Sequence, residues 1–212
     1  VYKVIGVVLV LYSLIFGLLT SIPDLPIIEE SIRNLFYHVS MWFAMVAMMA
    51  GSFAYSIVFL RRENLHADRR TAALTETGML FAFLGLFTGM IWARFTWGAW
   101  WTNDPKLNGS AITILIYLAY FILRNGIEDQ RKKARISAVY NIFAFVMMIV
   151  FIGILPRMTD SLHPGNGGNP GFHSYYLDNR LRLIFYPAVI GWILIGTWIA
   201  SLRYRIKNLS IT

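Results

Sequence analysis

Long apolar runs alternate with short polar segments along the whole chain. Six runs are long enough to cross roughly 30 Å of hydrocarbon as a helix. They cover about residues 4–22, 35–60, 72–93, 107–123, 136–155 and 183–202. Backbone amides inside a bilayer must be paired internally, and the alternation typical of a barrel strand does not occur, so the runs predict helices. The pattern therefore predicts an all-α integral membrane protein with six transmembrane helices in a single domain, residues 1–212.

The composition supports a membrane environment. Hydrophobic residues make up 57% of the chain and charged residues 14%, and the mean hydropathy is +0.57. The first run is not followed by an A-x-A-like cleavage site, so we expect a retained helix rather than a signal peptide. The formal net charge of +8 resides in short basic clusters between apolar runs, which indicates topology rather than a nucleic-acid partner. Membrane lipid is the expected surrounding.

The distribution of basic residues predicts the orientation of the helices. Segments on one side of the membrane hold thirteen of the 19 lysines and arginines, and segments on the other side hold six. Cytoplasmic loops retain positive charge during insertion, so both termini are expected in the cytoplasm. The segments around 23–34, 94–106 and 156–182 then face the periplasm. The search for function therefore starts on that outer side.

Tryptophan is concentrated in the second outer segment. Four of the seven tryptophans lie between Trp92 and Trp101, and T-W-G-A-W-W-T-N-D-P-K-L-N follows the third run. An interfacial aromatic belt is one interpretation, but it does not explain the concentration in one segment. The other is a flat aromatic platform for a large planar ligand. Gly98 would then let the backbone approach closely, and Asp104 or Lys106 would meet polar groups of the ligand.

This segment resembles the WWD signature, W-G-x-W-W-x-W-D-x-R-L-T, of the haem-handling protein superfamily. The positions that match are Trp97, Gly98, Trp100, Trp101, Asp104 and Leu107. Asn103 replaces a tryptophan, Lys106 an arginine and Asn108 a threonine. The six-run layout, the length and the upstream T-G-M-I-W-A are similar to the CcmC family, whereas CcmF-type and CcsA-type relatives usually have additional spans. The resemblance implies that the tryptophan segment holds haem.

Histidines are the candidate ligands of a haem iron, which accepts one or two axial imidazoles. His66 lies among arginines in an inner loop and is interpreted as a solvated residue. His38 lies at the outer mouth of the second run, where an ionisable group is functional by default. His163 follows the fifth run and His173 lies ten residues later. The resemblance implies that His38 and His163 are the axial pair, with His173 as the alternative second ligand.

Haem propionates require cationic partners. The outer candidates are Arg33, Arg94, Lys106, Arg157, Arg180 and Arg182. Arg94 and Lys106 are expected to bind the propionates, because they lie beside the tryptophans. With no cysteine, the chain cannot form a thioether to a haem vinyl group. The expected cofactor is therefore haem b, bound non-covalently and transiently.

The resemblance also implies partners and a location. CcmC-type proteins deliver haem to the chaperone CcmE at the periplasmic face of the bacterial inner membrane, with the CcmA–CcmB ABC transporter and CcmD. This sequence has no G-x-x-x-x-G-K-[ST] motif for binding ATP itself. We expect a delivery component rather than an enzyme, and whether it assists covalent attachment of haem to CcmE stays open.

Three other functions are compatible with the pattern. One is a CcsA-type haem-delivery or synthetase component. Another is a b-type cytochrome subunit of a respiratory complex, which requires histidines deep within facing helices, whereas no predicted span has an internal histidine. The last is a permease or assembly subunit whose tryptophans only anchor it.

Overall fold

The computed structural model describes residues 1–22, 29–163 and 178–209. Within these ranges every regular element is a helix, and six helices are long and apolar enough to cross a membrane. This confirms the predicted fold class. The six candidate spans are Tyr2–Leu19, Glu30–Arg62, Leu65–Trp97, Pro105–Asn125, Gln130–Met158 and Asn179–Leu209.

The spans are built from regular α-helices and two stretches of wider π-helix. In chain order the elements are α1 (Tyr2–Leu19), the 3-10 turn η1 (Glu29–Arg33), the π-helix η2 (Leu35–Val39), α2 (Ser40–Arg62), α3 (Leu65–Trp97), α4 (Pro105–Asn125), α5 (Gln130–Met148), the π-helix η3 (Ile149–Ile154), α6 (Leu155–Met158) and α7 (Asn179–Leu209). Elements η1 and η2 run directly into α2, and η3 continues α5 into α6.

The helices extend beyond the apolar runs because capping residues, not polarity, set where they end. α3 covers Leu65–Trp97, whereas the apolar run covers 72–93. It begins after Asn64, whose side chain accepts a hydrogen bond from the backbone N–H of His66. It ends at Gly98, whose positive φ of 76° gives the left-handed conformation typical of a helix C-terminus.

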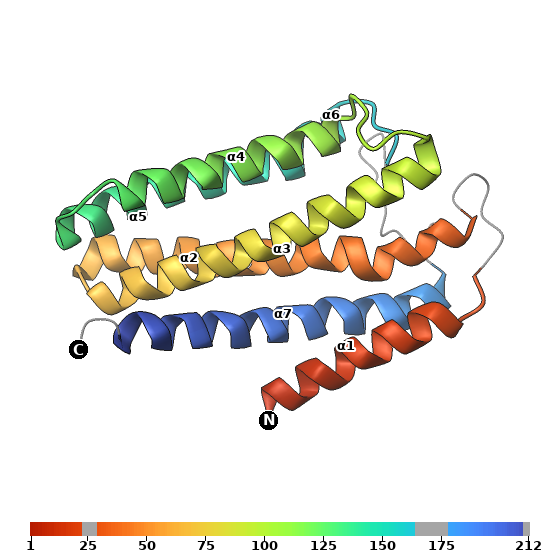
Figure 1. Ribbon diagram of the computed structural model, residues 1–212, viewed down its shortest axis with the longest axis horizontal. Coiled ribbons are helices and arrows are strands. Elements are labelled where there is room, and N and C mark those ends of the chain that lie inside the picture. The colour runs from red at the N-terminus through yellow and green to blue at the C-terminus, as the bar shows by residue number, and fades with distance from the viewer. Residues whose placement is uncertain (23–28, 164–177, 210–212) are drawn as a thin grey trace.

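The long helices lie side by side and their connections alternate between the two ends of the bundle (Figure 1). We call the end where α3 finishes and α4 begins the tryptophan end. The C-terminal end of α1 and the short helix α6 lie at this same end. The α2–α3 and α4–α5 connections lie at the opposite end. The three segments predicted to share one side of the membrane therefore all begin at the same end of the bundle.

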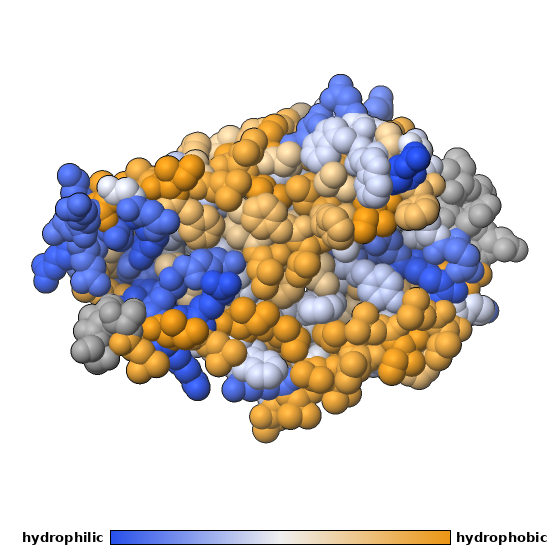
Figure 2. Space-filling view, in the orientation of Figure 1, coloured by the Kyte–Doolittle hydropathy of each residue, from blue (hydrophilic) through white to orange (hydrophobic). Residues whose placement is uncertain are grey.

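The outer surface matches a bilayer environment. In Figure 2, apolar side chains dominate the middle of the molecule, and hydrophilic side chains gather toward the two ends of its long axis. Large apolar side chains such as Leu115 and Phe87, each 62% exposed, point outward from the helices. Such exposed apolar surface is stable in lipid but not in water. The protein is therefore a multi-pass membrane protein.

Small residues allow close helix packing inside the bundle. The main core contains several methionines, among them Met45 and Met49, packed around Tyr117 and Phe81. At Gly109 of α4 an added Cβ would lie 2.3 Å from the carbonyl oxygen of Phe151 in η3. Glycine is thus required where α4 meets η3, as is usual for small residues at membrane helix contacts.

Hydrogen bonds between polar side chains connect the helices in the half of the bundle farther from the tryptophan end. Arg124 of α4 donates two hydrogen bonds of 2.7 Å to the carboxylate of Asp68 on α3. Asn141 of α5 donates to the hydroxyls of Ser52 and Ser56 on α2, both at 2.9 Å. These contacts join α2, α3, α4 and α5, so they stabilise the scaffold that supports the tryptophan end.

Candidate functional site

One face of α3 supports the residues that gather near the tryptophan end. Gly85, Gly89, Trp92 and Thr96 are spaced four, three and four residues apart, which places them on the same side of the helix. His38 bonds to the Gly85 carbonyl and packs on Gly89, and His163 lies against Trp92. Two histidines 125 residues apart in sequence therefore share one supporting helix.

His38 lies in the π-helix η2 and is held by the backbone of α3. Its Nδ1 lies 2.8 Å from the Gly85 carbonyl oxygen and 3.2 Å from the Thr88 hydroxyl. A carbonyl oxygen only accepts, so Nδ1 carries the proton and donates, which leaves the lone pair on Nε2. At Gly89 an added Cβ would lie 2.5 Å from His38 Cε1, so glycine is needed to admit the ring.

The helix that carries His38 begins earlier than the sequence predicted. His38 was expected at the mouth of a span starting at residue 35, with no histidine inside any span. In the structure η1 and η2 extend this helix outward, so the candidate span assigned by length and composition runs over Glu30–Arg62 and includes His38. A π-helix inside a longer helix is common at functional sites, because it changes the direction in which a side chain points.

His163 follows α6 and is fixed by a buried carboxylate. Its Nδ1 lies 2.9 Å from Oδ1 of Asp104, the residue just before α4. The His163 side chain is 16% exposed and that of Asp104 is fully buried. The imidazole also packs against two indole rings, with centroid distances of 4.8 Å to Trp97 and 5.6 Å to Trp92.

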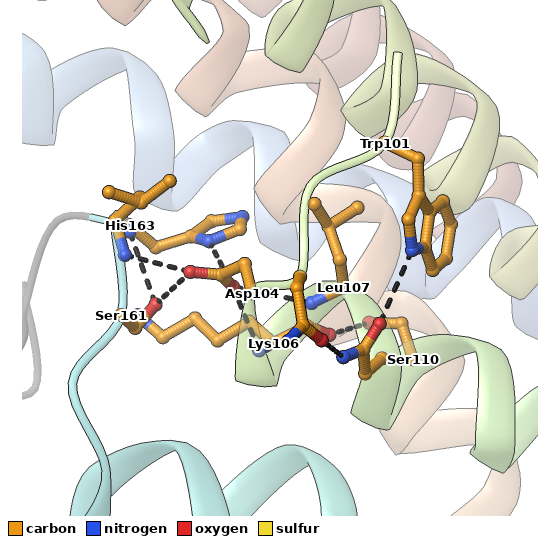
Figure 3. Close-up of polar contacts among 10 residues, drawn as sticks. Trp101, Asp104, Lys106, Leu107, Ser110, Ser161 and His163 are labelled. Carbon is orange, nitrogen blue, oxygen red and sulfur yellow. Dashed lines mark hydrogen bonds and ion pairs between the residues drawn. The ribbon is translucent and has the colours of Figure 1, made fainter. Parts of the chain in front are cut away.

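Asp104 joins the start of α4 to the segment that carries His163 (Figure 3). Its Oδ1 caps α4 by accepting from the backbone N–H of Lys106 at 2.9 Å and of Leu107 at 3.4 Å. Its Oδ2 accepts from the Ser161 hydroxyl at 2.8 Å and from the Leu162 N–H at 2.7 Å. Every contact described for this carboxylate is with a donor, as an ionised group requires.

The ionisation of Asp104 determines which nitrogen of His163 is available. Burial alone would raise the pKa of Asp104, but the hydrogen bond and charge of His163, together with the donors at Ser161 and Leu162, lower its pKa well below the usual range. An ionised carboxylate only accepts, so His163 donates from Nδ1, and in the neutral imidazole, the form that binds iron, the lone pair is on Nε2. Both histidines therefore present the same nitrogen as a potential ligand.

The two imidazoles also lie near each other. They are within electrostatic range of one another. The positions of α3 that they contact, Gly89 and Trp92, differ by roughly 4.5 Å along the helix axis. The structure thus brings together the two histidines singled out in the sequence. His173 lies outside the described residues, and His66 lies at the opposite end, where its Nδ1 is 3.2 Å from the Tyr204 hydroxyl.

The tryptophans divide into two groups rather than forming one loop. Trp92 and Trp97 belong to α3 and pack edge to face at a centroid distance of 4.9 Å beside His163. Trp100 and Trp101 follow the helix and are 52% and 39% exposed. The Trp101 indole donates to Asn108 on α4 at 3.3 Å. The loop is shorter than predicted because the first residue able to end α3 is Gly98.

Gly98 and the neighbouring cations have local roles in the structure. The guanidinium of Arg94 donates to the carbonyl oxygen of Gly98, which closes the end of α3. An added Cβ at Gly98 would meet nothing within 4 Å, so the space beside it is open. Lys106 lies in the first turn of α4 within electrostatic range of Asp104 and Arg157. Lys106 and Arg157 thus lie close to one another near the start of α4.

Sequence reasoning missed the residues of α3 and α6–α7 that orient the imidazoles. Gly85, Thr88 and Gly89 hold His38, and Ser161 supports Asp104. Gly85 and Gly89 form a G-x-x-x-G pattern within an apolar run, a sequence signal for close helix contact that was available. The role of Ser161 had no such signal, because it depends on a contact across 57 residues.

Comparisons with known proteins identify the family that this chain resembles. The family model described as CcmC, heme exporter protein C, matches residues 1–207. The chain is 27% identical over 164 residues to heme exporter protein C of Haemophilus influenzae, covering 75% of this chain and 64% of the relative. The corresponding Escherichia coli K12 protein is 22% identical over 176 residues, covering 83% and 70%.

A CcsA-type relative is also similar to this chain, over a shorter stretch. Cytochrome c biogenesis protein CcsA of Prochlorococcus marinus is 35% identical over 98 residues, which is 46% of this chain and 30% of that protein. The chain thus spans about two thirds of the heme exporter relatives that it matches and under a third of CcsA.

Proposed function

The chain belongs to the heme exporter protein C family, and we propose that it binds haem at its tryptophan end and delivers it for cytochrome c maturation. Haem is the cargo in this proposal, held non-covalently as haem b. One observation supports it above the others: His38 and His163, from separate elements, face one side of α3 with Nδ1 of each ring already donating to an acceptor.

The donor set fits haem iron. Iron in haem takes axial imidazoles through a ring nitrogen lone pair, and the second nitrogen is normally held by a carbonyl or carboxylate. Both histidines meet this requirement through Nε2. Trp97 packs against His163, and exposed Trp100 and Trp101 supply aromatic surface for a planar ring. Arg94 beside the tryptophans and Lys106, which lies within electrostatic range of Arg157, are the proposed cationic partners of the propionates.

We place this site at the periplasmic face of a bacterial inner membrane. The proposed acceptor is the chaperone CcmE, and the proposed partners are the CcmA–CcmB transporter and CcmD. The similarity to heme exporter proteins and the excess of basic residues at the other end of the bundle support this assignment. In this role the chain is a delivery component rather than a turnover enzyme.

Absorption spectra of the purified protein loaded with haem test the ligand assignment. The parent is expected to show a bis-histidine low-spin spectrum. His38→Ala and His163→Ala are each expected to lose it, and His66→Ala, at the opposite end, serves as the matched control. Loss of the spectrum in His173→Ala but not in His163→Ala would move the second ligand, and an unchanged spectrum in all variants would refute the site.

The orientation can be tested by cysteine labelling, because these 212 residues include no cysteine. Asp160→Cys lies at the tryptophan end and Glu128→Cys at the opposite end, and both positions are exposed. A membrane-impermeant maleimide added to cells with a permeabilised outer membrane is expected to label the first and to reach the second only after lysis. The reverse pattern would contradict a periplasmic site.

A further inference from the structure

The two candidate iron ligands have unequal partners. His38 donates to the neutral carbonyl of Gly85, with the Thr88 hydroxyl beside it. His163 donates to the carboxylate of Asp104. A carboxylate partner draws the Nδ1 proton toward itself and so increases the electron density on Nε2, whereas a carbonyl does so less. The His163 imidazole is therefore expected to be a stronger electron donor to iron than the His38 imidazole.

We propose that Asp104 is a positioning residue that orients His163 and makes it the stronger axial donor, which favours ferric over ferrous haem. The inference rests on the proposed function and deepens it. A more electron-donating axial ligand stabilises the higher oxidation state of iron, and hydrogen bonding to the ligand is one of the means by which a protein sets this balance.

Asp104 acts through His163 rather than by touching haem. Its side chain is fully buried, and its two oxygens already accept from His163, Ser161 and three backbone N–H groups. The five hydrogen bonds described for this carboxylate thus use both of its oxygens. The aspartate of the tryptophan motif thus links the start of α4 to the iron ligand.

The same carboxylate fixes the geometry of the ligand. The segment from Ser161 to His163 follows α6 and makes three bonds to Asp104, one of them through the imidazole. The His163 backbone N–H also donates to the Ser161 hydroxyl at 3.2 Å. Asp104 is buried at the start of α4, and the His163 ring is hydrogen-bonded to it through Nδ1. This bond fixes the direction in which Nε2 points.

Asp104→Asn is the informative variant, because asparagine is also a good helix N-cap and retains the size of the side chain. Asp160→Asn removes an exposed carboxylate three residues before His163 and controls for charge alone. Ser161→Ala removes one bond to Asp104 but leaves its charge and the imidazole contact, so it controls for weakened packing.

The first measurement uses the haem-free protein. Nitrogen-15 NMR of histidine-labelled protein, with His163 assigned by comparison with His163→Ala, is expected to show a proton fixed on Nδ1 in a strong hydrogen bond. Asp104→Asn is expected to lose this signature, whereas Asp160→Asn and Ser161→Ala retain it. A parent protein with the His163 proton on Nε2 would overturn the proposal, even if Asp104→Asn failed to fold.

The second measurement is the reduction potential of the haem-loaded protein. Asp104→Asn is expected to shift it to a more positive value, by more than either control, and Asp104→Glu is expected to recover part of the shift. A potential that moves equally in Asp104→Asn and Asp160→Asn would overturn the proposal. The proposed function fails differently, through a parent that binds no haem or a His163→Ala variant that keeps the bis-histidine spectrum.

Discussion

Gly89→Ala perturbs the site by adding one methyl group beneath His38. The new Cβ would lie 2.5 Å from His38 Cε1, whereas ordinary contacts of this kind begin at 3.4 Å. The imidazole must therefore retreat by about 0.9 Å, which disrupts its 2.8 Å bond to the Gly85 carbonyl and displaces Nε2. His38→Ala removes the ligand outright, but Gly89→Ala leaves it present and misplaced.

The expected magnitude follows from the cost of overpacking. Forcing an extra methyl group into a packed site costs typically about 1–3 kcal/mol. When iron holds the imidazole in its ligating position, that penalty opposes binding, so haem affinity is expected to fall by about 5- to 150-fold. The low-spin fraction of the bound haem is expected to fall as well, because displacement of a ligand by about 1 Å is large for a coordinated site.

Haem titration followed by absorbance measures both quantities. Gly126→Ala is the matched control, because Gly126 has an ordinary φ of −78° and its nearest contact to an added Cβ is 3.5 Å. In a His38→Ala background, Gly89→Ala is expected to have little further effect, since its action passes through the missing ring. Parent-like affinity in Gly89→Ala, or an equal loss in both backgrounds, would refute the reasoning.

Three further predictions concern the scaffold, each measured as the change in unfolding free energy of the detergent-solubilised protein. Gly109→Ala places a Cβ 2.3 Å from the carbonyl oxygen of Phe151, a backbone atom that cannot rotate aside, so a loss of about 3 kcal/mol is expected; a stability equal to the parent would contradict the close approach. Asp68→Ala leaves Arg124 buried without its bidentate partner and is expected to cost about 3–5 kcal/mol, and Asp68→Ala/Arg124→Met is expected to recover much of it. Asn141→Ala removes two bonds to serine hydroxyls, and since such bonds in a membrane average about 0.6 kcal/mol, a loss of about 1 kcal/mol is expected. A larger loss for Asn141→Ala than for Asp68→Ala would reverse this ranking.

The number and type of the helices could be predicted because lipid imposes a strict rule on the backbone. An apolar run long enough to cross the hydrocarbon has to be helical, so six runs predicted six helices. Their ends could not be predicted in the same way. Trp97 was assigned to a loop, although the helix continues until Gly98 adopts a positive φ. Polarity marks the edge of the membrane, whereas local capping marks the end of a helix.

The candidate site was predicted in its residues but not in its contacts. His38 and His163 could be singled out from their positions beside the apolar runs and from the resemblance, yet their support by Gly85 and Asp104 could not. The π-helix η2 changes which side of its helix His38 occupies, and the pairing of His163 with Asp104 spans 59 residues. Contacts of this kind depend on how the helices pack against one another. A single sequence has no repeating pattern that reveals which residues of two helices will meet.

The spacing between Gly89 and Trp92 on α3 sets a strict geometric condition on the whole tryptophan end. A single residue inserted between them would rotate the rest of α3, from Trp92 onward, by about 100° and shift it by about 1.5 Å along the axis. Trp92 would then no longer lie on the same side of α3 as Gly89. Loops at this end can change in length without that effect. Evolution is therefore expected to permit insertions and deletions on either side of this short stretch while keeping its residue count constant.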